Sequence, residues 1–358
     1  MSYMKRKIVT SMLGIFAIMV IVMATPPVRA IEEPTGTIDE ANSQITFNSG
    51  ALTAVFEGMG PKIMFYDHTS TTRVEQTVHF KALIEFADAD GNKVFESSEA
   101  VGRASLDEGK WTHTGFYGLP GSSGIGINFT LVDPIAIHDG TRMLPTGSVV
   151  LIVKAYNTTQ TLTVNGKPFV VNTAEIKIDV VIKGYPFLNT TNMLALQVDM
   201  KSSTQHYDMY EETGVSTVDG STDEGKTAEH EFKETMDVKQ ETRFSTGPIT
   251  ASSTVGFFHF VNTATVTPTS GASYSVPVTA SYKSESEIEG KDSGVEMKLY
   301  LAYPNFGDGT LVHDPSVGLG QGFPTLYLMV GGAAVAGLVA VVVIRRRHPK
   351  ISVDAVAN

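Results

Sequence analysis

Residues 77–86, Thr-Val-His-Phe-Lys-Ala-Leu-Ile-Glu-Phe, decide the fold class of this chain. Apolar side chains recur at every second position of the stretch: Val78, Phe80, Ala82, Ile84 and Phe86. This two-residue period is typical of a β-strand that buries one face. The same period recurs at residues 125–131, 176–182, 276–282 and 295–303. The sequence therefore predicts strands along most of its length.

The segments between these strands carry turn signals. Asp88-Ala89-Asp90-Gly91-Asn92 separates two strand-like segments, and Asn165-Gly166 separates residues 161–164 from 169–171. Asn-Gly accepts the positive φ angles of a type I′ turn, so a hairpin is predicted there. Residues 148–156 are more continuously apolar, which predicts a strand buried on both faces. Helical periodicity is absent between the two chain ends, so we expect a large antiparallel β-sandwich.

An acidic segment at residues 211–229 is the one candidate domain boundary. It holds six Asp and Glu among Gly, Ser and Thr. Its small apolar surface does not offset the entropy of ordering it, so we expect a mobile loop or linker. Two sandwiches, at about 37–200 and 231–319, would fit this boundary, but the second would have few strands. We favour one extracellular β-sandwich over residues 31–320 with a long acidic loop.

The C-terminal end predicts a membrane anchor. Residues 326–344 contain no charge and are followed by Arg345, Arg346 and Arg347. A helix of this length spans about 28 Å, close to the hydrocarbon thickness of a bilayer. Arginines directly after the span mark the cytoplasmic side, which makes residues 345–358 a cytoplasmic tail.

The N-terminal end predicts export of the chain. Three basic residues, Lys5, Arg6 and Lys7, precede an apolar segment at 8–24. Val28-Arg29-Ala30 follows, so residues 1–30 are predicted to be a signal peptide. An uncleaved anchor is the alternative. Both interpretations place the strand-rich part outside the cell, as a type I single-pass protein of the cell membrane.

Composition narrows the classes of partner. The net charge is −11, and eight of the 27 Lys and Arg, but only one of the 38 Asp and Glu, lie in the two terminal segments. The exported part is therefore strongly acidic, which argues against binding nucleic acid or anionic lipid. The chain has no cysteine, so it has no disulfide or thiolate metal site. Asn-x-Ser/Thr sequons at Asn128, Asn157 and Asn189 predict glycosylation.

These terminal features carry a resemblance. Two features of this chain resemble archaeal cell-surface proteins. One is the cysteine-free exported β-region with sequons. The other is a Gly322-Phe323-Pro324 element before an apolar helix that ends in three arginines. The Gly-Phe-Pro element is also similar to the C-terminal signals processed by archaeosortases, which carry Pro-Gly-Phe, an apolar helix and a basic end. This chain departs from that pattern in residue order and in residues 348–358 beyond the basic cluster. The resemblance implies a surface protein with an anchor, and no such processing is expected.

Catalytic motifs give no support for an enzyme. Gly121-Ser122-Ser123-Gly124 lacks the spacing of a nucleophile elbow, and His230-Glu231 lacks the second histidine of a zinc-protease helix. A pair of glycosidase carboxylates on distant strands would leave no spacing signal. Enzymatic activity therefore stays open and is not favoured.

The loop with Asp88, Asp90 and Asn92 could present oxygens to Ca²⁺. Glu99 occupies the twelfth position of a calcium loop counted from Asp88, but we expect a strand between them, so this match is treated as a coincidence. Asp-Gly is also what an ordinary hairpin turn prefers. The turn is the favoured interpretation, with calcium as the alternative.

Two further groups are candidate ligand-binding residues. Trp111, His113 and Tyr117 lie with Phe116 in a Gly- and Pro-containing segment and could stack against a sugar or anchor a partner. The alternative is that these rings cap the core, as large aromatic residues commonly do. His313-Asp314 could titrate near neutrality or bind a metal, whereas the alternative is a turn that precedes Pro315.

The favoured hypothesis is a single-pass cell-surface protein with a structural, adhesive or recognition role, and envelope glycans or surface proteins as partners. Gly332 and Ala336 have the small-xxx-small spacing that allows a homodimer through the membrane helix. Two alternatives remain open. One is a membrane-tethered extracellular enzyme that acts on carbohydrate. The other is a receptor that captures cations or solutes through the acidic loop.

Overall fold

The computed structural model describes residues 33–319 except 59, 72, 123, 165–166, 203–205, 212–213, 217–238, 246–253 and 286–295. The predicted signal peptide, membrane helix and cytoplasmic tail all lie outside this part of the chain and stay predictions. Within the described part, no helix is long and apolar enough to cross a membrane. Most of the acidic segment at 211–229 also lies outside it, although residues 214–216 form a strand where a loop was expected.

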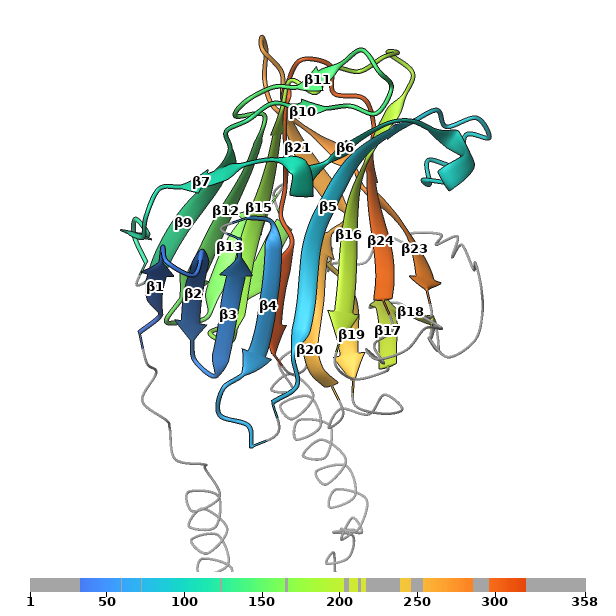
Figure 1. Cartoon of the computed structure of the whole chain (residues 1–358). Helices are drawn as coiled ribbons and strands as arrows, with labels where there is room; N and C mark the ends of the chain where they lie inside the picture. The colour runs from blue at the N-terminus through green and yellow to red at the C-terminus, as the bar shows by residue number, and fades with distance from the viewer. Residues whose placement is uncertain are drawn as a thin grey trace, which may run out of the picture.

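Two large antiparallel sheets form the molecule (Figure 1). The first sheet has the order β1-β2-β3-β4-β5-β16-β24-β23, and β6 also pairs with β5. Its strands are β1 (Thr35–Asp39), β2 (Gln44–Ser49), β3 (Leu52–Glu57), β4 (Lys62–Asp67), β5 (Gln76–Phe86), β6 (Ala100–Ser105), β16 (Met193–Ser202), β23 (Thr279–Glu285) and β24 (Glu296–Tyr303).

The second sheet has the order β18-β17-β19-β20-β26-β15-β12-β9-β7, with β8, β21, β22 and β25 attached beside this path. Its strands are β7 (Trp111–His113), β8 (Tyr117–Gly118), β9 (Gly124–Leu131), β12 (Val149–Tyr156), β15 (Glu175–Lys183), β17 (His206–Glu211), β18 (Gly214–Ser216), β19 (Lys239–Ser245), β20 (Thr254–Val261), β21 (Thr263–Thr267), β22 (Tyr274–Pro277), β25 (Thr310–His313) and β26 (Ser316–Leu319).

Smaller elements complete the chain. β10 (Ile135–Ala136) pairs with β11 (Met143–Leu144), and β13 (Gln160–Val164) pairs with β14 (Lys167–Val171). Two short 3₁₀ segments are η1 (Ser97–Glu99) and η2 (Leu106–Glu108). Val164 lies opposite Lys167, which is the pairing expected of a two-residue hairpin at Asn165-Gly166.

The core lies between the two sheets, so the predicted all-β sandwich is confirmed. One apolar cluster joins residues of both sheets. Phe56 of β3 stacks on Phe129 of β9 with ring centroids 4.8 Å apart, and Phe80 of β5 faces Phe258 of β20 at 6.4 Å. Strands from before and after the acidic segment contribute to both sheets, because β16 pairs with β24 and β15 pairs with β26. The two parts of the chain therefore share one core.

Both ends of the described chain lie at one end of the sandwich. β1 begins beside the end of β2, and β26 ends beside the start of β15. The Ser49 hydroxyl at the end of β2 donates to the Thr173 carbonyl just before β15 at 2.8 Å, so these edges of the two sheets meet. We call this the lower end, and the opposite end with β10 and β11 the upper end, as they are drawn in Figure 1.

Residues 77–86 form a strand as predicted, but the predicted apolar residues do not all point to the same face of the sheet. Lys81 is the extra residue of a β-bulge where β5 pairs with β16. Val78 and Phe80 face the main core before the bulge, and Leu83 does so after it. The other predicted residues face the opposite side, in a second apolar cluster: Ala82, Ile84 and Phe86. One inserted residue inverts the alternation, because side chains repeat every two residues.

Three other strand predictions also need correction in detail. Residues 149–156 alternate between buried and partly exposed, so β12 has one buried face and not two. β15, by contrast, is buried on both faces, because its outward residues Glu175, Lys177 and Asp179 are also buried. Residues 276–282 are not one strand, because the chain crosses from β22 in the second sheet to β23 in the first at Val278.

We expect the Phe56–Phe129 contact to be a main source of stability. Phe56→Ala removes a fully buried ring and leaves a cavity between the sheets, which costs about 3–5 kcal/mol of unfolding free energy. Leu188→Ala, at a side chain that is 59% exposed, should change it by about 0.5 kcal/mol or less. Denaturant unfolding of both variants measures this, and equal effects would contradict the placement of the core.

Candidate functional site

Four charged residues form a cluster on the outer face of the second sheet. Lys154 of β12 lies directly opposite Lys177 of β15. β25 and β26 both pair with β15, and they do so in the same unbroken register, since His313 pairs with Val180 and Ser316 with Lys177. This register places Asp314 opposite Asp179. We call Lys154, Lys177, Asp179 and Asp314 the lysine–aspartate cluster.

Opposite charges meet within the lysine–aspartate cluster. Lys177 Nζ donates to Asp179 Oδ1 and to Asp314 Oδ1, and Lys154 Nζ donates to Asp179 Oδ2 at 2.5 Å. Lys177 is only 2% exposed and Asp179 7%. Charges this deeply buried are stable in a fold only when they are paired.

The β13–β14 hairpin lies over this part of the outer face. Leu162 and Val171 of the hairpin belong to one apolar cluster with Tyr156 of β12 and Val261 of β20. β15 and β26 run between β12 and β20, so these contacts bracket Lys177. The hairpin thereby covers part of the face around Lys177, while the side chains of Lys154 and Asp314 stay partly exposed.

The pKa values in the cluster follow from burial and from the neighbouring charges. Burial raises the pKa of Asp314, the charge of Lys177 opposes this, and the neighbouring Asp179 adds to the rise. Burial opposes ionisation of Asp179 as well, but Lys177 and Lys154 outweigh it and lower the pKa of this carboxyl. Burial alone would lower the pKa of Lys177, yet the two aspartates raise it. Asp314 is thus the carboxyl that holds a proton more readily, and Asp179 stays ionised between the two lysines.

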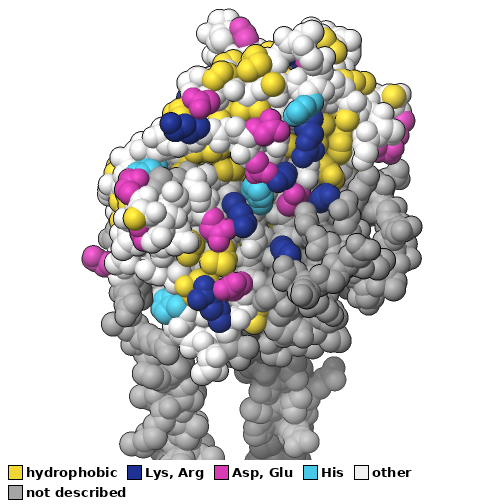
Figure 2. Space-filling model, viewed as in Figure 1, with side chains coloured by type: hydrophobic (Ala, Val, Ile, Leu, Met, Phe, Trp, Pro, Cys, Tyr) yellow, Lys and Arg dark blue, Asp and Glu magenta, His cyan; other side chains and the backbone are white. Residues whose placement is uncertain are grey.

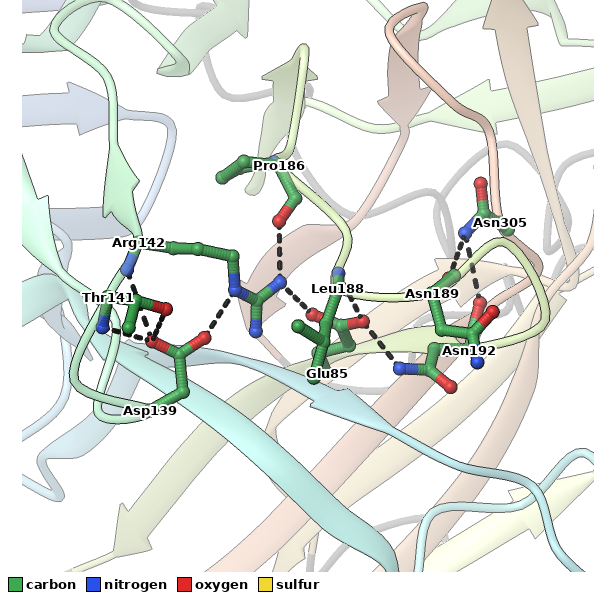
Figure 3. Close-up of polar contacts among 9 residues, drawn as sticks. All are labelled: Glu85, Asp139, Thr141, Arg142, Pro186, Leu188, Asn189, Asn192 and Asn305. Atoms are coloured by element: carbon green, nitrogen blue, oxygen red, sulfur yellow. Dashed lines mark hydrogen bonds and ion pairs between the residues drawn. The ribbon is translucent and has the colours of Figure 1, made fainter.

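A second buried charge network lies at the upper end (Figure 3). Glu85 of β5 has no exposed surface. Its Oε1 accepts hydrogen bonds from the Leu188 backbone N–H at 2.8 Å and from Asn192 Nδ2 at 2.6 Å, and its Oε2 accepts one from Arg142 Nη1. Arg142 Nε also donates to Asp139 Oδ2. These contacts fix residues 185–192 and the β10–β11 hairpin to the first sheet.

The connection between β10 and β11 is organised by Asp139. Its Oδ1 accepts the backbone N–H groups of Thr141 at 2.9 Å and Arg142 at 3.2 Å. The Thr141 hydrogen bond, together with the Arg142 guanidinium, lowers the pKa of Asp139 to about 2. Asp139 therefore stays ionised at neutral pH and holds Arg142 in place for Glu85.

The candidate aromatic residues do not form one binding surface. Trp111 is 9% exposed in β7, and its Nε1 donates to the Leu106 carbonyl at 3.1 Å. His113 is mostly buried, with Nε2 3.4 Å from Glu40 Oε1. Tyr117 of β8 reaches the outer face, where its hydroxyl donates to Asn128 Oδ1 at 2.7 Å. Burial raises the pKa of Tyr117, and the charge of Asp179 adds to the shift. Tyr117 therefore lies near the lysine–aspartate cluster, whereas Trp111 caps the core.

His313 and Asp314 point to opposite faces of their strand. Asp314 belongs to the lysine–aspartate cluster, whereas His313 is fully buried among core residues. Its Nε2 lies 2.6 Å from the Val261 carbonyl and its Nδ1 2.9 Å from the Tyr303 hydroxyl. A neutral ring satisfies both contacts when Nε2 donates and Nδ1 accepts. Burial accordingly lowers the pKa of His313 to about 4.

The candidate calcium loop differs from its sequence prediction at Glu99. Residues 92–96 form no strand, and η1 turns the chain back. Carboxylate oxygens of Asp88, Asp90 and Glu99 consequently lie within 4.8 Å of one another. The assumption that a strand separates Glu99 from this loop is therefore wrong. Asn92 donates to Asp90 Oδ2 at 2.8 Å, and Lys93 adopts a φ of 62° where a calcium loop commonly has glycine.

The three sequons differ in accessibility. Asn189 is exposed between β15 and β16 at the upper end. Asn128 lies within β9, and its side-chain oxygen accepts the Tyr117 hydroxyl. Asn157 is partly buried, directly after β12. Asn189 is therefore the sequon best placed for modification of the folded chain.

Sequence reasoning missed Lys154, Lys177 and Asp179, as well as the Glu85–Arg142 pair. A signal for the first group was present in β15, where charged residues occupy alternate positions of a central apolar strand. Buried charges in such a strand need partners on the neighbouring strands. The identity of those partners depends on the register, which the sequence alone does not provide.

We expect His313 to make the fold less stable at acidic pH. The unfolded histidine binds a proton near pH 6.5, whereas the folded one does so only near pH 4. The contribution of the neutral His313 ring to the free energy of unfolding is therefore complete above pH 6.5. It is lost as the pH falls toward 4, by about 3 kcal/mol in total. Denaturant unfolding at several pH values should show a weaker pH dependence for His313→Gln. The exposed control His138→Gln should follow the wild type, and an unchanged slope in His313→Gln would contradict the assignment.

The calcium hypothesis predicts that about 1 mM Ca²⁺ raises Tm relative to a chelated sample. Glu99→Gln should remove this difference, because it deletes one charged oxygen ligand. Glu108→Gln, at an exposed carboxylate outside the loop, should retain it. Equal Tm values with and without Ca²⁺ in the wild type would show that the loop is an ordinary turn.

Comparison with known proteins adds no assignment. No protein-family model matches the chain, and no curated protein matches its sequence. Its function is therefore argued from the geometry of its own residues.

Proposed function

We propose that this chain is a membrane-anchored cell-surface protein whose β-sandwich binds a component of the envelope through its upper end. The position of the chain ends carries this proposal. β1 begins and β26 ends at the lower end, so the predicted signal segment and the predicted membrane helix both connect there (Figure 1). Only residues 320–325 separate the sandwich from the predicted helix. The lower end would then face the membrane and the upper end would face outward.

The upper end carries exposed apolar side chains. Met143 of β11 is 48% exposed, Leu188 59% and Tyr274 of β22 47%, and these are the exposed large apolar residues of the described chain. Tyr274 belongs to this end because it pairs with Val266 of β21, beside the end of β15. Hydrophobic side chains also gather at the upper end of the face drawn in Figure 2. Exposed apolar residues on a fixed scaffold are typical of recognition surfaces.

The buried Glu85–Arg142 pair makes this surface rigid. Leu188 donates its own backbone N–H to Glu85, and Met143 directly follows Arg142. Two of the three exposed residues are thus attached to groups with fixed positions. A preorganised surface loses less conformational entropy when it binds a partner. This supports recognition or adhesion over a passive spacer.

The two alternative functions have less support. A glycosidase needs carboxyl groups about 5–9.5 Å apart across an open cleft. Asp179 and Asp314 instead both accept hydrogen bonds from Lys177, and Asp179 is buried. The receptor hypothesis relies on the acidic segment at 211–229, most of which lies outside the described residues. The homodimer through Gly332 and Ala336 concerns residues outside them as well.

Binding to envelope material tests the proposal. The full chain in membrane vesicles should bind purified envelope glycans or proteins. The double variant Leu188→Asp/Tyr274→Asp should bind at least about tenfold more weakly, because charge replaces two apolar contacts. Thr35→Asp, at an exposed residue of the lower end, is the matched control and should bind like the wild type. Equal binding by the double variant, or a sandwich that resists protease added to intact cells, would contradict the proposal.

A further inference from the structure

The lysine–aspartate cluster holds the groups for a covalent reaction that surface recognition does not require. Lys177 supplies a primary amine, and Asp314 supplies a carboxyl on the neighbouring strand. Asp179 is a second carboxyl in contact with both. We propose that Lys177 and Asp314 condense to an intramolecular amide bond, with Asp179 as the proton-transfer residue.

The sheet register selects these two partners. Asp314 lies opposite Asp179, two residues along β15 from Lys177, on the same outer face. Diagonal neighbours of this kind have Cβ atoms about 7–8 Å apart or somewhat less, within reach of a lysine. Lys177 Nζ already contacts Asp314 Oδ1. Asp179 also contacts Lys177, but it lies two residues away on the same strand, so a bond to it would join no separate elements.

Burial favours the reaction over a simple ion pair. Lys177 is only 2% exposed, which limits the access of water to the amine. Two carboxylates directly opposite each other repel, which favours a proton on one of them during the reaction. That carboxyl is Asp314, whose pKa burial raises. A protonated carboxyl is the form whose hydroxyl can leave as water.

The step balances without any further reactant. The Lys177 ammonium group passes one proton to Asp314 across their contact, which frees the lone pair on Nζ and leaves Asp314 protonated. Nζ then adds to Cγ of protonated Asp314, and the C–N bond forms. The hydroxyl of Asp314 leaves with a second proton from Nζ, relayed through Asp179, as one water molecule. The products are the amide, water and the unchanged Asp179 carboxylate, so charge and atoms are conserved.

The bond would join β15 to the connection between β25 and β26, just before the last strand of the second sheet. β26 ends at Leu319, and the predicted membrane helix begins shortly after it. The chain has no cysteine, so no disulfide can make such a link. An amide between side chains is a covalent crosslink that does not depend on redox conditions.

Peptide mapping of the folded full chain tests the proposal. Trypsin should not cut after an acylated Lys177, so the peptide of residues 178–183 should be at least tenfold depleted. Lys177 should instead be found in a branched species with the peptide that carries Asp314, at the summed mass minus one water. Recovery of unmodified 178–183 in full yield from the wild-type protein would overturn the proposal, and this measurement needs no variant.

Variants assign the individual roles. Lys177→Arg and Asp314→Ala should each eliminate the branched species and release 178–183. Lys183→Arg is the matched control, because this exposed lysine at the end of β15 lies outside the lysine–aspartate cluster, and it should keep the branched species at the wild-type level. Asp179→Asn keeps both bond-forming groups and should lower the branched fraction at least tenfold. A wild-type yield in Asp179→Asn would overturn the role of Asp179.

Discussion

The structure depends on how one central strand pairs its buried charges. β15 is buried on both faces, so the outward carboxylates and amine of Glu175, Lys177 and Asp179 all need partners inside the protein. β12 supplies Lys154, and the chain between β25 and β26 supplies Asp314. The cost of leaving any of these charges unpaired exceeds the gain from most single packing contacts. The register of three neighbouring strands is thereby restricted to the one that pairs them.

The interruption between β25 and β26 serves both faces of the second sheet. Pro315 cannot donate a backbone hydrogen bond, but its carbonyl still accepts the Ile178 N–H at 2.8 Å, so the register continues through it. Asp314 points outward to Lys177, and His313 points inward to Tyr303 of the first sheet. Two adjacent residues thus connect the hairpin-covered outer face with the core between the sheets.

The sequence predicts well which segments are strands, and poorly which side of the sheet each side chain occupies. Period-2 patterns correctly placed strands at β5, β9, β15 and β24, because alternation reflects a strand with neighbours on two faces. The pattern could not reveal the bulge at Lys81, since apolar residues on both sides of it pack in different clusters. Glu99 was set aside for a related reason, because a strand was assumed where the chain turns back. The charge clusters depend on register, which is a property of the whole sheet.

The proposed membrane anchor at the C-terminal end gives a mechanical reason for the position of the lysine–aspartate cluster. In a surface protein held by its C-terminal helix, tension from a bound partner would enter the sandwich through β26. The backbone pairing of β26 with β15 and β20 would carry part of that load, and β26 makes only a short pairing with each. Those pairs could open in sequence from Leu319 upward. An amide at Asp314 lies just beyond β26, so it would stop such opening before it reached the core contacts of His313. A covalent link is most useful at this strand, where the proposed anchor and the proposed binding surface pull in opposite directions.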